Sequence, residues 1–143
     1  MRNWILAVGM AVAIGGAGAA IAQDVIADRR AGLKNAGEQF QAIKAVSDAR
    51  GDLRPVAAQI DELIAFFRGL PARFPEGSGT GNTRALPAIW SDRAGFEQAN
   101  ANLITQLTAL RALAAAGDNA AFPAAFNQTG AACGACHRVN RAR

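Results

Sequence analysis

Cys133-Gly134-Ala135-Cys136-His137 contains both cysteines and the only histidine of the chain. A C-x-x-C-H string is the attachment signature of c-type haem. On a helix, residues three and four positions apart lie on one face, so two thiols and an imidazole can reach one porphyrin. The string therefore predicts one haem c per chain, bound covalently through Cys133 and Cys136, with His137 as an axial ligand of the iron.

Two neighbouring cysteines can also belong to three other kinds of site. A zinc site needs roughly four ligands, and this stretch offers three candidates. A redox dithiol normally follows a strand in a βαβ pattern, and the sequence shows no such pattern. A disulfide between Cys133 and Cys136 is chemically possible but leaves His137 without a role. We therefore interpret the stretch as a haem attachment site.

Upstream of the motif, apolar residues recur at helical spacing in two segments. The first runs from about Asp24 to Ala49. The second begins at Pro55, where the missing N–H costs little, and stops near Gly69. Residues 71–87 are rich in proline, glycine, serine and threonine and are expected to form a long crossover loop.

Two further helices are expected after this loop. One follows Ile89 and Trp90, has Ser91 or Asp92 as its N-cap, and ends at Gly117. The last starts near Phe122, because Pro123 is tolerated in the first turn of a helix, and it carries the haem motif. The sequence therefore predicts an all-α fold, an antiparallel four-helix bundle with covalently attached haem near one end.

The N-terminus has the pattern of a secretory signal. Arg2 supplies a positive start, residues 4–14 are apolar, and Ala20-Ile21-Ala22 matches an A-x-A cleavage site. An uncleaved membrane anchor is the alternative, but the apolar run is short and glycines interrupt it. We predict that residues 1–22 are a cleaved signal peptide and that residues 23–143 form one mature domain. The mature protein is expected to be periplasmic, with no membrane segment after cleavage.

The charge of the chain is weakly basic. Loss of Arg2 with the signal peptide lowers the net charge from +4 to +3, and two haem propionates offset most of it. This balance is too weak to indicate a nucleic-acid partner. Arg138, Arg141 and Arg143 cluster near the C-terminus. The cluster could steer an acidic partner, or it could be a solvated helix end that complements the helix dipole.

A sixth ligand for the iron is missing from the sequence. Electron-transfer cytochromes c usually use Met or His at that position, but Met1 and Met10 lie in the predicted signal peptide and the chain has no tyrosine. Lys34 and Lys44 are the remaining side-chain nitrogen candidates. We expect a five-coordinate, high-spin iron with an open site for a small diatomic ligand. Since no second histidine can move a proton, an enzyme that turns over peroxide is not expected.

Three features resemble the class II cytochromes c, specifically cytochrome c prime, over nearly all of the mature chain. The haem motif is C-terminal. The segment Arg29-Arg30-Ala31-Gly32-Leu33 is similar to the family's first-helix motif. The segment Pro87-Ala88-Ile89-Trp90-Ser91-Asp92 is similar to the family's entry into the third helix.

The resemblance implies roles for further residues. Arg29 would pair with a haem propionate, Arg30 would contact the haem edge, and Leu33 would pack over the distal face. The remaining implied contacts are Thr83, Arg84 and Ala85 from the crossover loop, Trp90 at the haem edge, and Arg141 near the proximal imidazole. Asn140 departs from the family, which often has an aromatic residue there. The family is commonly dimeric through its first two helices, so a homodimer is implied.

Two functions follow from these expectations. The first is a haem protein that binds NO, and CO in the ferrous state, and protects the periplasm from NO, with Leu33 as a steric filter. The alternative is a periplasmic electron carrier that docks a redox partner. Against the carrier, a vacant iron site lets the ligand shell change with redox state, which tends to slow electron transfer.

Overall fold

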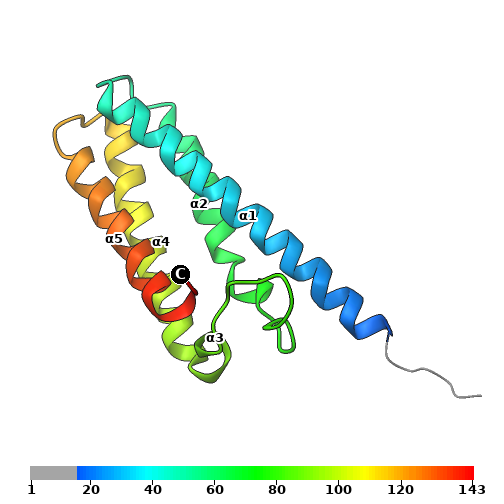
Figure 1. Cartoon of the computed structure of the whole chain (residues 1–143). Coiled ribbons are helices and arrows are strands. Elements are labelled where there is room, and N and C mark those ends of the chain that lie inside the picture. Colours follow the sequence, from blue (N-terminus) through cyan, green and yellow to red (C-terminus); the bar gives the residue numbers. More distant parts are fainter. Residues whose placement is uncertain (1–15) are drawn as a thin grey trace, which may run out of the picture.

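The computed structural model describes residues 16–143, with burial and side chains described from Gln23 onward. The predicted signal peptide, residues 1–22, falls outside the part whose side chains are described. The chain forms an antiparallel four-helix bundle (Figure 1), which confirms the predicted fold class. Its long helices are α1 (Gly16–Asp48), α2 (Val56–Arg68), α4 (Arg93–Ala116) and α5 (Phe122–Asn140). Two short helices, η1 (Pro71–Arg73) and α3 (Ala88–Ser91), lie between α2 and α4.

Local signals in the sequence fix the helix ends. Gly117 adopts a left-handed conformation with φ of 67° and ends α4, as expected for a C-terminal glycine. Helix α5 begins at Phe122, so Pro123 lies in its first turn. Asp92 is the N-cap of α4 and accepts a hydrogen bond from the backbone N–H of Gly95 at 3.0 Å. The predicted N-cap of the third long helix, Ser91 or Asp92, is thus confirmed at Asp92, and α3 is a separate turn because the backbone bends at this residue.

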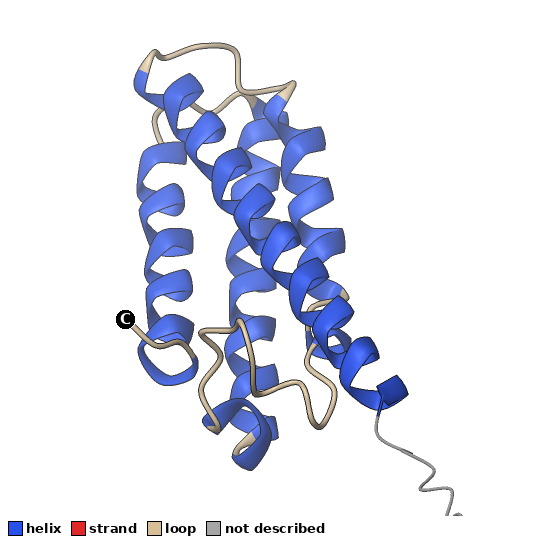
Figure 2. Cartoon of the chain, turned by 45° about the vertical axis from the view of Figure 1, so that its right-hand side comes forward, coloured by secondary structure: helices blue, strands red, loops and turns tan. Residues whose placement is uncertain are grey.

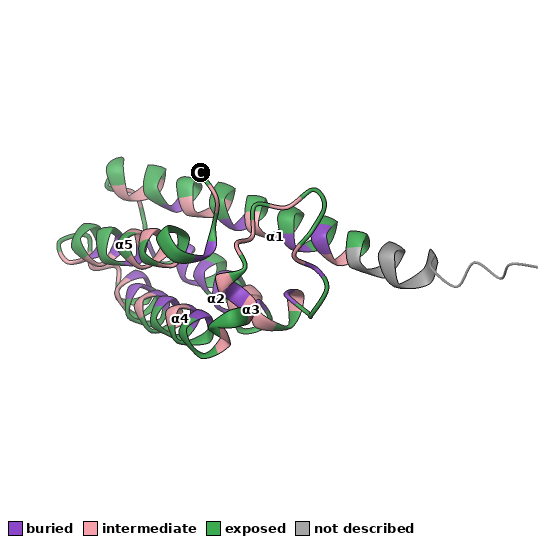
Figure 3. Cartoon of the chain, turned by 60° about the horizontal axis from the view of Figure 1, so that its bottom comes forward, coloured by how far each residue is buried: buried purple, intermediate pink, exposed green. Residues whose placement is uncertain are grey.

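The core lies between the inward faces of the four long helices, and the outward faces are exposed (Figure 3). Helix α4 packs closely against both α2 and α5, whereas α1 approaches α5 at only a few residues. The rings of Phe40 and Phe126 stack at 4.1 Å and join α1 to α5 at one end of the bundle. Gly32 allows α1 to approach α2, because a Cβ at this position would lie 2.3 Å from the ring of Phe66.

The crossover segment is tied to the end of α5 (Figure 2). Leu86 N–H donates to the carbonyl of Asn140 at 3.0 Å, and Ala142 N–H donates to the carbonyl of Arg84 at 2.8 Å. These bonds accompany an isolated antiparallel bridge between Ala85 and Arg141. The tie places the crossover segment beside the C-x-x-C-H motif.

Within residues 16–143, no helix combines the length and the apolar character that crossing a membrane requires.

Candidate functional site

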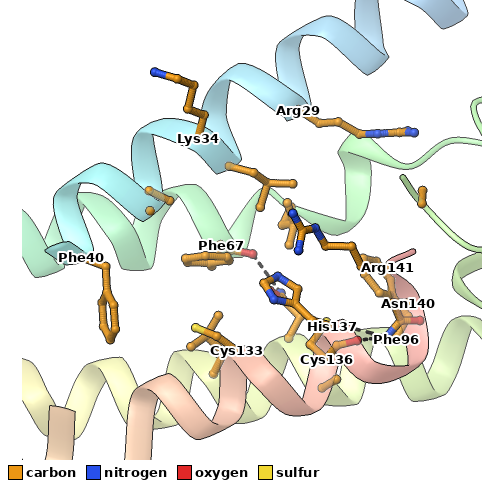
Figure 4. Close-up of a pocket in the computed structure, with 18 of the residues that line it drawn as sticks. Arg29, Lys34, Phe40, Phe67, Phe96, Cys133, Cys136, His137, Asn140 and Arg141 are labelled. Atoms are coloured by element: carbon orange, nitrogen blue, oxygen red, sulfur yellow. Dashed lines mark hydrogen bonds between the residues drawn. The ribbon is translucent and has the colours of Figure 1, made fainter. Parts of the chain in front are cut away.

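A cavity of about 710 Å³ separates α1 from α5 (Figure 4). Helices α2 and α4 line its inner side through residues such as Leu63, Phe67 and Leu103. Its size is within the range of about 300–1,000 Å³ that is usual for ligand and cofactor sites. The cavity lies between α1 and α5, which is why the two helices approach each other at only a few residues.

The haem motif lies on the α5 wall of the cavity. Cys133, Cys136 and His137 all line it, and the two thiols are half-buried and not joined to each other (Figure 4). In the described part of the chain, no group of three or more His, Cys, Asp or Glu side chains could hold a metal ion. The zinc and disulfide alternatives therefore gain no support from the structure.

The thiols are not activated as redox nucleophiles. Burial raises the pKa of both Cys133 and Cys136 above the usual range, and the proximity of Cys136 raises that of Cys133 further. The side-chain amide of Asn140 donates weakly to Cys136 Sγ at 3.6 Å and partly opposes this shift in pKa. Reactive dithiols instead have depressed pKa values that favour the thiolate.

His137 has the protonation state that iron ligation requires. Burial lowers its pKa, and the positive charges of Arg141 and Arg84 lower it further. The imidazole is therefore neutral at pH 7, which is the form that binds metals.

Arg29 is the most unusual charged residue of the cavity wall. Its side chain is 1% exposed. Nη1 donates to Ser78 Oγ at 2.8 Å, and Nη2 donates to the Ser78 carbonyl at 2.7 Å and to Thr83 Oγ1 at 2.8 Å. The guanidinium also lies 4.4 Å from the ring centre of Phe74. Every one of these partners is uncharged, and burial lowers the pKa of Arg29.

This environment fits an amphiphilic anion such as haem. A buried cation without a carboxylate partner is costly, and an anion in the cavity would reduce that cost. Most of the cavity wall is apolar and suits a porphyrin ring, while Arg29, Arg30, Arg84 and Arg141 supply positive charge toward one end. The residues present therefore fit a haem with two propionates.

Arg29 also holds the crossover segment in place. Replacing Arg29 with Met is expected to lower the free energy of unfolding by roughly 2–4 kcal/mol, because several charge-assisted hydrogen bonds to the loop are lost. Urea denaturation of the haem-loaded protein measures the change. Arg30→Met is the matched control, because Arg30 is exposed and its replacement removes the same charge from α1. Equal losses in the two variants would contradict this role.

Leu33 lines the cavity from α1, opposite the α5 wall. Both lysines that remained as candidates for the sixth ligand are engaged elsewhere. Lys34 lines the cavity but forms an exposed ion pair with Glu38. Lys44 pairs with Asp48 at 2.6 Å and does not line the cavity. Among the described residues, His137 is thus the one conventional iron ligand in the cavity wall apart from the two cysteines.

The structure brings most of the predicted site residues together. Besides the motif, Arg29 and Leu33, the cavity is lined by Arg30, Thr83, Arg84, Ala85 and Arg141. Trp90 is the exception, because it packs outside the cavity against Phe74 and Gly79. Its indole N–H donates to the carbonyl of Pro75 at 3.0 Å. In this structure Trp90 shapes the crossover loop, and its contact with the haem edge stays a prediction.

Two asparagines lie in the cavity wall, and sequence reasoning missed Asn100 and gave Asn140 no structural role. Asn100 is buried on α4, and its Nδ2 donates to the Phe67 carbonyl at 2.9 Å. The sequence pattern that could have identified Asn100 is a polar residue four positions after Phe96, on the apolar face of the helix. Asn140 is also buried and donates to the Cys136 carbonyl at 3.1 Å, so it secures the last turn of α5 where an aromatic residue is usual in the family.

Comparison with known proteins gives a consistent result. The family model described as Cytochrome C′ matches residues 24–141. Cytochrome c′ from Rhodopseudomonas palustris is 37% identical over 132 residues, which covers 90% of this chain and 89% of that protein.

Solved structures agree with this match. The nitric oxide complex of a cytochrome c prime mutant from Alcaligenes xylosoxidans has a TM-score of 0.77 at 29% identity, covering 85% of this chain and 96% of that one. Cytochrome c′ from Rubrivivax gelatinosus has a TM-score of 0.75 at 28% identity, covering 85% and 97%.

Proposed function

Because the chain belongs to the cytochrome c prime family, whose members bind covalent c-type haem, we propose that it is a periplasmic haem protein that binds NO and CO. The observation that carries this proposal is the ligand inventory of the cavity. His137 can occupy one axial position of the iron, and the described cavity wall offers no Met, Tyr or second His for the other. The nitric oxide complex of a structural neighbour supports the choice of gas.

In this proposal, residues on different sides of the cavity have different roles. Cys133 and Cys136 anchor the haem covalently, and His137 holds the iron from the α5 side. Arg29 and Arg84 offer guanidinium groups to the propionates, a pairing that suits the two-pronged donor geometry of arginine. When bound, the haem supplies an iron centre with one axial position available to a diatomic gas.

Leu33 selects among gases in two ways. Its side chain limits the room on the α1 side, which disfavours weakly bound ligands. It also donates no hydrogen bond, and stable oxygen binding normally depends on a distal donor. The described cavity wall also lacks a second imidazole to move protons, so we propose a binding protein and not an enzyme.

We also propose that residues 1–22 direct export and are removed, so that residues 23–143 act in the periplasm. The outer faces of α1 and α2 are the proposed contact between two copies of the chain, by analogy with the family. The mass of the exported protein tests whether residues 1–22 are removed. Its sedimentation tests whether two copies of the chain associate.

Absorption and resonance Raman spectra of the purified haem-loaded protein test the proposed function. We expect a high-spin five-coordinate iron at neutral pH, and new spectra when NO or CO is added to the reduced protein. Reduction by dithionite without gas is the control. A six-coordinate low-spin iron with no response to either gas would contradict the proposal. Fast reduction by a protein donor together with no NO binding would favour the electron carrier.

A further inference from the structure

Four arginines gather beside the mouth of the cavity, and we call them the C-terminal basic patch. Arg138, Arg141 and Arg143 line a shallow hollow of about 500 Å³ together with His137 and Leu86. Arg84 completes the patch from the crossover segment, because its backbone carbonyl and its Nε both bond to Ala142. Arg141 also lines the haem cavity, so the patch adjoins the site directly (Figure 4).

The backbone under the patch is fixed. The bridge between Ala85 and Arg141 ties two segments that are distant in sequence, and Arg84 Nε donates to the Ala142 carbonyl at 3.1 Å. The positive charges are therefore held near one another by the fold. A solvated helix end alone would not include a residue of the crossover loop.

The charges of the patch are not compensated within the described part of the chain. The ion pairs found there use Lys34, Lys44, Arg54, Arg93 and Arg111, and none involves a patch arginine. Residues 119–143 contain no Asp or Glu. The basic residues elsewhere on the bundle thus often have acidic neighbours. In the patch, Arg84 is offered to a haem propionate, and Arg138, Arg141 and Arg143 leave their charge for another molecule.

An exposed apolar side chain is adjacent to the patch in sequence. Val139 is 57% exposed, and no other large hydrophobic residue of the described chain is exposed. It follows Arg138 directly and precedes Arg141 by two positions. Protein interfaces commonly combine an apolar centre with a polar or charged rim.

We propose that the C-terminal basic patch docks an acidic electron-donor protein that reduces the haem iron. This inference rests on the proposed function, because CO binds ferrous haem and the iron must therefore be supplied with an electron. The donor loses one electron and the ferric iron gains it, with no bond made or broken in this chain. Opposite charges steer the two proteins together.

Stopped-flow reduction by flavodoxin hydroquinone, an acidic flavoprotein, tests the proposal on the haem-loaded protein. The anionic hydroquinone gives up one electron and becomes the neutral semiquinone. We expect the double variant Arg138→Glu/Arg143→Glu to lower the second-order rate constant by about tenfold or more at low ionic strength. The deficit should shrink as salt screens the charges. Neither residue belongs to the proposed haem contacts, so the absorption spectrum of the haem should be the same in the variant as in the parent. This comparison verifies that the haem site is intact.

Two references separate charge steering from other effects. The double variant Arg50→Glu/Arg54→Glu makes the same change of charge at two exposed residues between α1 and α2 and should stay within about twofold of the parent. Uncharged lumiflavin semiquinone, which loses one electron and releases its proton to solvent, should reduce all variants equally. An unchanged flavodoxin rate, or an equal loss with lumiflavin, would overturn the proposal. Binding of CO after dithionite reduction is measured on the same samples, so failure of gas binding is recognised separately.

Discussion

Replacing Cys133 and Cys136 together with serine is expected to abolish covalent haem attachment. Serine hydroxyls do not add to the haem vinyl groups, so the haem would be held by His137 and cavity contacts alone. A denaturing gel stained for haem and the intact mass of the protein both measure the loss. Ala135→Ser is the matched control, because this exposed residue lies between the two cysteines and acquires the same side chain.

The same variant is expected to lose cooperative unfolding. Without haem, the apolar wall of the cavity would face water instead of the porphyrin, and the lost contact is large against a total stability of about 5–15 kcal/mol. The chain without haem would therefore close the cavity or loosen α1. Haem retained through boiling in detergent, or a thermal transition like that of the parent, would contradict the assignment of the two thiols.

Shortening Leu33 to alanine is expected to raise the CO affinity of the reduced protein by roughly 5- to 150-fold. Pushing a packed leucine aside costs about 1–3 kcal/mol, and each 1.4 kcal/mol changes an equilibrium constant tenfold. Removing the side chain removes that cost. Titration of the ferrous protein with CO, followed by absorption, gives the dissociation constant directly.

Leu33→Ile is the control for this experiment, since it keeps the volume of the side chain and should leave the CO affinity near that of the parent. Resonance Raman spectra of both variants verify that His137 still binds the iron. If Leu33→Ala has unchanged CO affinity, Leu33 is not the residue that restricts the open position.

The fold was largely accessible from sequence because its signals are local. Apolar spacing identified the four long helices, and Gly117, Asp92 and Pro123 marked ends that the structure confirms to within a few residues. The helix η1 and the separate turn α3 were not predicted. Both lie in the crossover segment, whose path depends on contacts with residues far away in the chain, such as Arg29 and Asn140.

The residues of the candidate site also fall into some that the sequence predicted and some that it did not. The C-x-x-C-H string, Leu33 and the arginines follow from motifs and from the family resemblance, and the cavity unites them. The position of Trp90 could not be derived, because the Pro75 carbonyl in the crossover loop and the space beside Gly79 decide where the indole packs. Asn100 was missed for a related reason, since its partner is a backbone carbonyl on another helix.

The two walls of the cavity come from α1 and α5, which lie at opposite ends of the sequence. A chain that emerges N-terminus first therefore presents Leu33 about a hundred residues before Cys133. Until α5 follows, the apolar side of α1 has no opposite wall, and no partial chain can enclose the haem. Maturation is consequently a late event, and the thiols that capture the haem arrive together with the helix that completes its pocket.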